Sequence, residues 1–185
     1  MSLILASGSP RRLALLRELA LEPIVIPAEI DENPRPGEGA TTYVERLAIE
    51  KGAAVVDQVK PSDVVVSADT IVVLDGALLG KPTNDEDAKM MLCRLSGRAH
   101  QVMTGVAVHT AGVLSSFVEV THVHFAELTD EDIDWYVSTG EPADKAGAYG
   151  MQGRGGAFVV SIEGSYDNVI GLPRYRLRPL IADLF

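Results

Sequence analysis

The sequence predicts an α/β protein with a mixed, twisted sheet, and three observations point to this fold class. Apolar, strand-like runs alternate with helical patterns in the first half of the chain. Two longer strand-like runs at residues 101–110 and 114–125 meet at Ala111-Gly112, which predicts an antiparallel hairpin. Hydrophobic residues make up 46% of the 185 residues, which is enough for a substantial core. We therefore expect a single domain over residues 1–185, with its sheet in two lobes separated by a groove.

The elements of the first half each have a local signal. Pro10 suits the first position of a helix, and Thr42 and Glu45 have the spacing of a capping box at the start of another. Three consecutive valines from Val64 are typical of a strand buried on both faces. The expected elements are, in order, a strand at residues 3–6, a helix at 10–20, a strand at 23–28, a loop at 29–40, a helix at 42–56, and extended segments at 64–66 and 71–74.

In the second half, Asn84 and Thr129 resemble N-caps, because acidic residues that suit the first turn of a helix follow each of them. Residues 140–171 hold eight of the 17 glycines, which predicts tight turns or close backbone approaches. Besides the hairpin above, the expected elements are a helix ending at residue 95, a helix ending near residue 140, a second hairpin formed by 157–162 and 165–170, and a terminal helix at 176–185.

The composition limits the partners and the compartment. A net charge of −10 would repel the phosphates of a long nucleic acid, so we expect no nucleic-acid polymer as a partner. No apolar run approaches the roughly 18 residues of a membrane span, and the N-terminus lacks the pattern of a secretory signal. The single cysteine cannot form an internal disulfide, which favours the reducing cytoplasm. Several basic residues instead lie in Gly-, Ser- and Pro-rich segments, which predicts a small anionic ligand.

The segment from Ser7 to Arg12, Ser-Gly-Ser-Pro-Arg-Arg, is the strongest functional signal. It follows an apolar run and precedes a helical pattern, so it offers backbone N–H groups at a helix N-terminus together with Ser7, Ser9, Arg11 and Arg12. Such a set suits a polyphosphate. The alternative is a capped turn whose arginines are solvated. The spacing is not that of a P-loop.

Asp69 and Glu32 are the candidate metal ligands. Asp69 follows the valine run, at what we expect to be the end of a strand, where ligands of such sheets bind. The alternative is that it caps a turn. Glu32 lies in an acidic loop, where a solvated charge is the plainer interpretation. Mg²⁺ typically takes one or two carboxylates together with substrate phosphates, so these two residues suffice if the fold joins them.

Three lysines and one glutamine complete the candidates. Lys81 stands between Gly80 and Pro82, and Lys51 and Lys145 are further point charges suited to phosphate oxygens. Lys51 has the alternative of a lysine whose stem lies along an apolar helix face. Gln152 precedes a glycine in a Gly-rich stretch and could donate and accept at a base edge, or belong to an ordinary turn.

Several of these segments together resemble the Maf family of nucleoside triphosphate pyrophosphatases, in the same order and over nearly the whole chain. They are Ser7-Gly8-Ser9-Pro10-Arg11-Arg12, Ser67-Ala68-Asp69-Thr70, Gly80-Lys81-Pro82, the stretch from Gly140 to Gly153, and Gly164-Ser165-Tyr166 with the stretch from Asn168 to Pro173. The resemblance implies a fold related to the inosine-triphosphate pyrophosphatases (Maf/Ham1), with a deep central cleft. It also implies hydrolysis of a nucleoside triphosphate to the monophosphate and pyrophosphate.

The resemblance further implies roles for individual residues. Asp69 matches the family's proposed general base, and Arg12, Thr70 and Gln152 match positions associated with the subgroup that prefers dTTP and UTP. Mg²⁺ or Mn²⁺, held by Glu32 and Asp69, would assist the attack of water on the α-phosphorus. The residues expected to bind the substrate are Ser7, Ser9, Arg11, Arg12, Lys51, Thr70, Lys81, Lys145 and Gln152.

Two other functions stay open at this point. One is a phosphatase that releases inorganic phosphate from the γ position. The other is a non-catalytic nucleotide-binding regulator of cell division, since the family name carries a link to division arrest as well as to cleaning of the nucleotide pool. The sequence does not rank dTTP, UTP and modified pyrimidine nucleotides as substrates. It also leaves open whether the protein forms a homodimer, because the segment around Arg174, Arg176 and Arg178 is more basic than we expect for the family.

Overall fold

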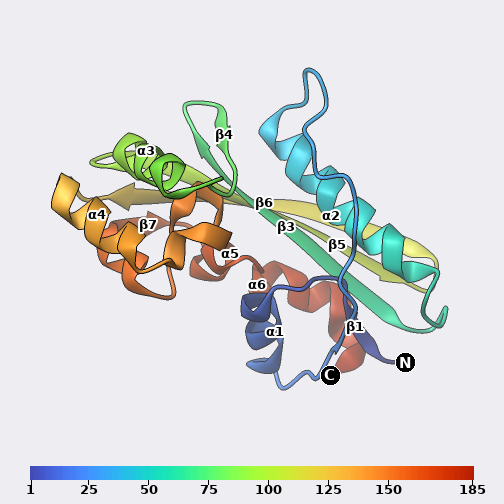
Figure 1. Cartoon of the computed structure of the whole chain (residues 1–185). Helices are drawn as coiled ribbons and strands as arrows, with labels where there is room; N and C mark the ends of the chain where they lie inside the picture. The colour runs from blue at the N-terminus through green and yellow to red at the C-terminus, as the bar shows by residue number, and fades with distance from the viewer. The chain divides into compact units, whose positions relative to one another are not determined.

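The computed structural model describes residues 1–185 and shows the expected mixed α/β architecture (Figure 1). A seven-stranded sheet has the order β2-β1-β3-β5-β6-β7, with β4 paired to β3. The pairs of β1 with β2 and β3 are parallel, whereas β4 with β3 and β7 with β6 are antiparallel. The strands are β1 (Leu3–Leu5), β2 (Ile24–Val25), β3 (Val64–Leu74), β4 (Ala77–Leu79), β5 (Ala99–Thr110), β6 (Val113–Phe125) and β7 (Val159–Glu163).

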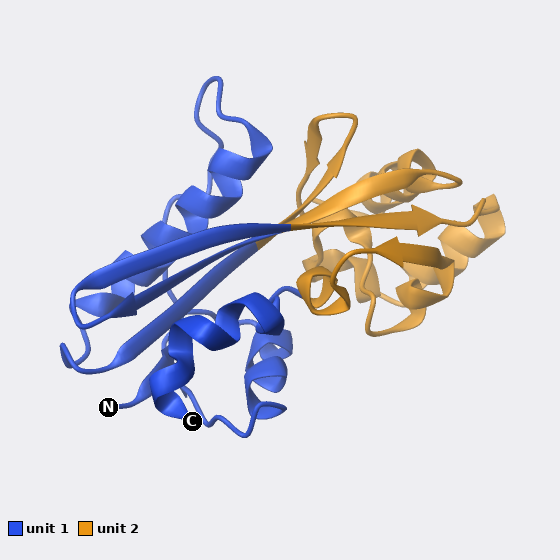
Figure 2. Ribbon diagram, turned by 180° about the vertical axis from the view of Figure 1, so that it is seen from behind, with its two compact units in different colours: residues 1–69, 104–119, 171–185 blue, residues 70–103, 120–170 orange.

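The chain divides into two compact units (Figure 2). Unit 1 comprises residues 1–69, 104–119 and 171–185, and unit 2 comprises residues 70–103 and 120–170. The strands β3, β5 and β6 contribute residues to both units, so neither unit is one uninterrupted stretch of chain.

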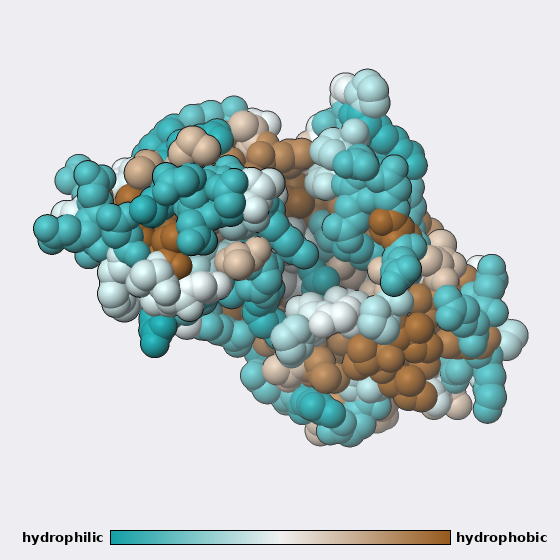
Figure 3. Space-filling view, in the orientation of Figure 1, coloured by the Kyte–Doolittle hydropathy of each residue, from teal (hydrophilic) through white to brown (hydrophobic).

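Unit 1 contains the helices α1 (Pro10–Arg17), α2 (Ala40–Val56) and α6 (Arg174–Leu177) and the 3₁₀ segment η4 (Arg178–Leu184). One face of α2 is buried: Val44, Leu47, Ala48 and Val55 follow the spacing of a single helical stripe. The surface along α2 is mainly hydrophilic, whereas a hydrophobic area lies in the part of unit 1 that contains both termini (Figure 3).

Unit 2 contains α3 (Asp85–Leu95), α4 (Asp130–Ser138), α5 (Tyr166–Ile170) and the 3₁₀ segments η1 (Glu141–Asp144), η2 (Ala146–Ala148) and η3 (Arg154–Phe158). Its core packs α3 and α4 against the sheet around Leu92, Phe125, Tyr136 and Tyr149. Edge-to-face contacts among the aromatic rings, such as Phe125 with Tyr149 at 4.7 Å between centroids, fix their orientation. None of the protein's helices is both long enough and apolar enough to cross a bilayer.

Several local predictions are confirmed. Asn84 caps α3 by accepting from the Asp87 N–H, and Thr129 forms a capping box with Asp132 at the start of α4. The predicted hairpin is β5 and β6, joined by Ala111 and Gly112 with φ of 49° and 80°. Positive φ at both positions is the geometry of a tight two-residue hairpin turn.

The prediction that a valine strand ends before Asp69 is wrong, because β3 runs without interruption from Val64 to Leu74. Ser67 and Asp69 are turn formers in isolation, but here both are buried and have partners on other elements. The Ser67 hydroxyl donates to the Ala48 carbonyl of α2 at 2.7 Å. Partners of this kind let polar residues occupy the interior of a strand.

The prediction of a second hairpin at 157–162 and 165–170 is half wrong. The first segment overlaps β7, but the second forms the helix α5. Ser165 accepts from the backbone N–H of Asn168, and the Asn168 amide, fully buried, donates to the Val102 carbonyl and the Thr121 hydroxyl. A serine cap and a buried amide therefore replace the expected strand.

Three helix boundaries also differ from the predictions. Gly39, not Thr42, is the N-cap of α2, and it makes no side-chain capping bond. The first helix ends at Arg17 rather than at residue 20, where Ala20 has a φ of 60°. The terminal segment begins earlier than expected, at Arg174, and becomes a 3₁₀ helix instead of a continuous α-helix.

Candidate active site

The Ser-Gly-Ser-Pro-Arg-Arg segment forms a rigid strand–helix connection in unit 1. Ser9 is the N-cap of α1 and accepts from the Arg12 N–H at 3.4 Å, while Pro10 takes the first position of the helix. The buried Arg12 guanidinium donates from Nε to the Gly171 carbonyl at 2.9 Å and from Nη1 to the Ser7 hydroxyl at 3.0 Å. The Gly171 carbonyl and the Ser7 hydroxyl therefore fix the orientation of the Arg12 guanidinium at the N-terminus of α1.

Three charged groups of unit 1, Asp69, Arg11 and Glu32, act electrostatically on the Arg12 guanidinium. Burial lowers the pKa of Arg12, and the negative charges of Asp69 and Glu32 act in the opposite direction. The neighbouring Arg11 contributes a second positive charge that also lowers the pKa of Arg12. The two arginines and the two carboxylates predicted from sequence therefore share one region of unit 1.

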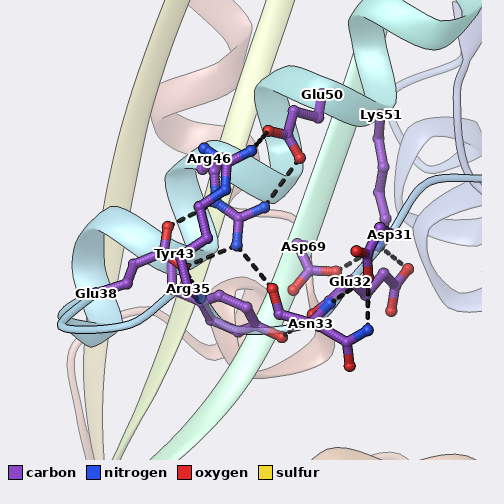
Figure 4. A network of polar contacts seen from close by, with 10 residues as sticks. All are labelled: Asp31, Glu32, Asn33, Arg35, Glu38, Tyr43, Arg46, Glu50, Lys51 and Asp69. Carbon is purple, nitrogen blue, oxygen red and sulfur yellow. Dashed lines mark hydrogen bonds and ion pairs between the residues drawn. The ribbon is translucent and has the colours of Figure 1, made fainter.

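Asp69 is paired directly with Lys51. The Lys51 Nζ lies 2.6 Å from Asp69 Oδ1, and both residues are only 9% exposed. The same ammonium lies 2.7 Å from Glu32 Oε1, whose side chain is half-exposed. Figure 4 shows the Lys51 side chain extending from α2 to both carboxylates. A buried charge is tolerated only when it is paired, so Lys51 is more than a lysine lying along an apolar face.

The donor set fits a divalent cation completed by substrate. Glu32 and Asp69 both contact the one Lys51 ammonium, so their oxygens lie close enough to share a single cation. The protein has no group of three or more His, Cys, Asp or Glu side chains that could hold a metal ion. A pair of carboxylates matches Mg²⁺, which retains water or substrate oxygens in its remaining positions.

The two lysine candidates of unit 2, Lys81 and Lys145, lie on segments that a backbone hydrogen bond joins. Lys81 is exposed, follows β4, and its ammonium makes no hydrogen bond or ion pair. The Gly147 N–H donates to the Gly80 carbonyl at 3.0 Å, which ties the segment of Lys81 to that of Lys145. Lys145 itself donates to the Glu141 carbonyl and to Asp144, each at 2.6 Å. Lys145 therefore has a structural role that the sequence did not predict, while its phosphate-binding role stays a prediction.

Gln152 stands on a glycine-rich loop that one carboxylate holds in place. Glu141 accepts from the Arg154 N–H at 3.1 Å, the Gly155 N–H at 3.2 Å and the Tyr136 hydroxyl at 3.0 Å. The Tyr136 oxygen in turn accepts from the Gly150 N–H at 3.2 Å. Gln152 is exposed, and its amide makes no hydrogen bond within the protein, so it is available to a ligand.

The glycines of this loop are required by space. A Cβ at Gly153 would lie 2.5 Å from Glu141 Oε1, and a Cβ at Gly155 would lie 2.6 Å from the Tyr136 oxygen. Partial burial opposes ionisation of Glu141, but the hydrogen bonds that it accepts outweigh burial and lower its pKa. The loop thus packs onto an ionised carboxylate through backbone groups alone.

The sequence analysis did not identify the residues that hold the glycine-rich loop of unit 2 and the acidic loop of unit 1. Glu141 and Tyr136 had no signal beyond their closeness in sequence to the glycine-rich stretch. In unit 1, Arg46 bonds Glu38 and Glu50, and the spacing of Arg46 and Glu50 by four residues on α2 was a sequence signal for an ion pair.

A cavity of unit 1 contains none of the predicted site residues. It has a volume of about 740 Å³ and is lined by residues that include Phe117, Tyr175, Arg176, Arg178 and Phe185. Arg176 is already paired with Glu119 at 2.9 Å and stacked on Phe117. The residues that line the cavity include no carboxylate side chain, in contrast to the region around Asp69 and Glu32.

Comparison with known proteins bears directly on this arrangement. Residues 2–184 match a family described as "Maf-like protein". A protein of Anaeromyxobacter dehalogenans named "dTTP/UTP pyrophosphatase" is 54% identical, covering 92% of this chain and 88% of its own. A protein of Vibrio parahaemolyticus with the same name is 48% identical over 99% of this chain and 97% of its own.

A solved structure agrees with the fold. The Ham1 protein of Staphylococcus aureus matches with a TM-score of 0.50 and 17% sequence identity, covering 69% of this chain and 73% of that chain. At this identity the likeness bears on the fold alone, and it agrees with the expected relation to Ham1-like proteins.

Proposed function

The chain belongs to the Maf family, and we propose that it hydrolyses dTTP and UTP to the nucleoside monophosphate and pyrophosphate. The observation that carries the proposal is the contact of the buried Lys51 with Asp69 and with the half-exposed Glu32, in the region of Arg12. It combines acidic groups that can hold a cation and accept a proton with basic groups that can neutralise phosphates. The names of relatives about half identical to this chain supply the substrates.

Binding of the triphosphate rests on the N-terminus of α1. The Arg12 guanidinium is already ordered by Ser7 and Gly171, so little freedom is lost when it meets a phosphate. Arg11 and the backbone N–H groups at the helix start add positive potential. We assign Ser7, Ser9, Arg11 and Arg12 to this task.

Asp69 acts as general base in the proposed reaction. A water molecule attacks the α-phosphorus, its oxygen forms the new P–O bond, and the bond to the bridging oxygen of the β-phosphate breaks. The proton of the water passes to a carboxylate oxygen of Asp69 and then to solvent, and pyrophosphate leaves with the electron pair of the broken bond. Asp69 Oδ1 contacts Lys51, so Oδ2 is the oxygen we assign to the proton.

Glu32 and Asp69 would hold a divalent cation, which supplies charge neutralisation at the phosphate oxygens and lowers the pKa of water. Lys51 then has a second task, because its ammonium neutralises charge that develops on the phosphates once the carboxylates share another cation. From unit 2 we assign Lys81 and Lys145 to phosphate oxygens, and Thr70 and Gln152 to nucleotide choice.

The decisive experiment compares Asp69→Asn with the wild type on a panel of nucleoside triphosphates with Mg²⁺, measuring monophosphate, pyrophosphate and inorganic phosphate. We expect kcat to fall by about 10²–10⁴ while nucleotide binding persists. Asp57→Asn, which changes an exposed aspartate at the end of α2, is the matched control and should leave turnover unchanged.

Three outcomes would contradict the proposal. Unchanged turnover in Asp69→Asn would refute the role of this residue. Release of inorganic phosphate with a diphosphate would identify a phosphatase instead. Saturable nucleotide binding without any metal-dependent turnover in the wild type would identify a non-catalytic regulator.

A further inference from the structure

Glu32 stands on a loop whose own side-chain hydrogen bonds, Asn33 with Asp31 and Arg35 with Glu38, are exposed and span only two or three residues. Residues 29–39 form no helix or strand, they include two prolines, and residues 31–37 are all exposed. An exposed loop without apolar contacts samples many conformations, and fixing it costs conformational entropy. The single contact of Glu32 with Lys51 joins two long side chains, so it cannot by itself define the path of eleven residues.

Arg46 of α2 binds this loop at two points. Its Nε and Nη2 contact the two carboxylate oxygens of Glu38 at 2.6 and 2.7 Å, and Nη2 also donates to the Asn33 carbonyl at 3.2 Å. The side chains of Arg46 and Glu38 are only 11% and 6% exposed. A shielded, two-pronged contact of this type is directional and much stronger than an exposed ion pair.

Tyr43, one turn earlier on α2, holds the loop at Glu32 itself. Its hydroxyl donates to the Glu32 carbonyl at 2.8 Å, and the Arg46 guanidinium lies 5.5 Å from the centre of its ring. Tyr43, Arg46 and Glu50 follow the spacing of one helix face, and Glu50 accepts from Arg46 at 2.9 Å. Figure 4 shows these side chains and Lys51 projecting from α2 toward the loop and Asp69.

We propose that Arg46, acting through Glu38, Asn33 and Tyr43, is a positioning residue that holds residues 32–38 so that the Glu32 carboxylate lies beside Asp69. This deepens the proposed function, on which its kinetic part rests. Arg46 does not touch the reacting groups. A lysine at this position keeps the charge but cannot contact both oxygens of Glu38 and the Asn33 carbonyl together.

The test is a double-mutant cycle with Arg46→Lys, Glu32→Gln and the double variant, assayed for dTTP hydrolysis at varied Mg²⁺. We expect Arg46→Lys to raise the half-saturating Mg²⁺ concentration about tenfold, as for groups that orient metal ligands. In the Glu32→Gln background the same substitution should change the half-saturating Mg²⁺ concentration by less than twofold, because Arg46 acts through Glu32. Arg17→Lys, an exposed arginine paired with Glu22 in the same unit, is the control and should match the wild type.

A readout independent of activity is backbone hydrogen exchange of the protein alone. Within residues 32–38, the N–H groups of Asn33, Arg35 and Glu38 have hydrogen-bond acceptors. Their exchange should rise about tenfold or more in Arg46→Lys and in Glu38→Gln, which loses the same contact from the other side, with no change in unit 2. If Arg46→Lys does not fold, Glu38→Gln takes its place in the cycle.

The outcomes separate this inference from the proposed function. The positioning role would be overturned if Arg46→Lys changed the half-saturating Mg²⁺ concentration equally in the wild-type and Glu32→Gln backgrounds. Unchanged exchange at residues 32–38 would overturn it as well. If the wild type fails to hydrolyse dTTP, the proposed function fails, while increased exchange confined to residues 32–38 would still support the contact as the device that fixes the loop.

Discussion

The two loops that carry predicted site residues are held in opposite ways. In unit 1, residues 29–39 are exposed and charged, and the side chain of Arg46 reaches from α2 to bind them. In unit 2, residues 150–156 turn around the carboxylate of Glu141, which accepts from their backbone N–H groups. One loop is held by a cation that donates to the Glu38 side chain and the Asn33 carbonyl, the other by an anion that accepts from backbone N–H groups.

The difference in attachment carries a difference in energetics. The Glu141 loop packs onto the buried Tyr136 and has no room for a Cβ at Gly153 or Gly155, so it belongs to the core of unit 2. Residues 31–37 of the Arg46 loop are exposed even when the loop is bound, so they add little to the core of unit 1. We conclude that unit 2 presents Gln152 on a loop packed against Tyr136, whereas unit 1 presents Glu32 on an exposed segment held by side chains of α2.

Replacing the two anchoring carboxylates by alanine should separate these cases most strongly. Glu141→Ala leaves the Tyr136 hydroxyl and the N–H groups of Arg154 and Gly155 without their acceptor, and we expect unfolding free energy to fall by about 4 kcal/mol. Glu38→Ala should lower the denaturant midpoint much less than Glu141→Ala does and increase exchange only at residues 32–38. Urea titrations of both variants test this, and equal destabilisation would refute the distinction.

Acid should also affect the two units differently. Burial lowers the pKa of His100 in unit 2 to about 4, with the charge of His124 as a smaller cause. The unfolded chain therefore binds the proton at higher pH than the folded chain, and stability falls as pH drops from about 6.5 toward 4, by about 3 kcal/mol at pH 4. The hydrogen bond from Arg46, the largest cause, lowers the pKa of Glu38 to about 2. That contribution is complete above about pH 4.5 and is lost only as pH falls toward 2.

The measurement is urea unfolding of the wild type and His100→Gln between pH 7 and pH 4. The difference in unfolding free energy between the two proteins should change by about 3 kcal/mol over this range, because glutamine does not titrate. Exchange at residues 32–38 should keep its protection at pH 5. A pH-independent difference would show that His100 is not held neutral by burial.

The sequence predicted the residue types of the site better than the way they are held. Asp69 and the two arginines of the Ser-Gly-Ser-Pro-Arg-Arg segment are candidates because their neighbours mark them locally, whereas the spacing around Glu32 favoured a solvated charge. The partner of Asp69 lies 18 positions earlier in the chain, on α2, and no local pattern indicates that contact. For the same reason Asp69 was placed at a strand end, although its partner lets it occupy the strand interior.

The fold shows the same division between local and distant information. The caps at Asn84 and Thr129 and the hairpin turn at Ala111-Gly112 depend on adjacent residues, and all were predicted. The helix α5 depends on Asn168, whose amide bonds Val102 and Thr121 at separations of 66 and 47 residues. Side chains that satisfy buried groups at such distances decide a segment's conformation without leaving a periodic pattern.

The smallest expected effect distinguishes a shielded arginine from an exposed one in the same region. Arg35 also contacts Glu50, at 2.7 Å, but its side chain is 63% exposed against 11% for Arg46. Water screens the exposed pair and holding its long side chain costs entropy, so Arg35→Lys should change the unfolding free energy by only about 0–1 kcal/mol. We expect kcat/KM for dTTP within twofold of the wild type, since the Arg35 backbone N–H still donates to Glu38. If Arg35→Lys raised the half-saturating Mg²⁺ concentration as much as Arg46→Lys, the loop would respond to any loss of charge pairing, and the geometry of the Arg46 contacts would not be what fixes Glu32.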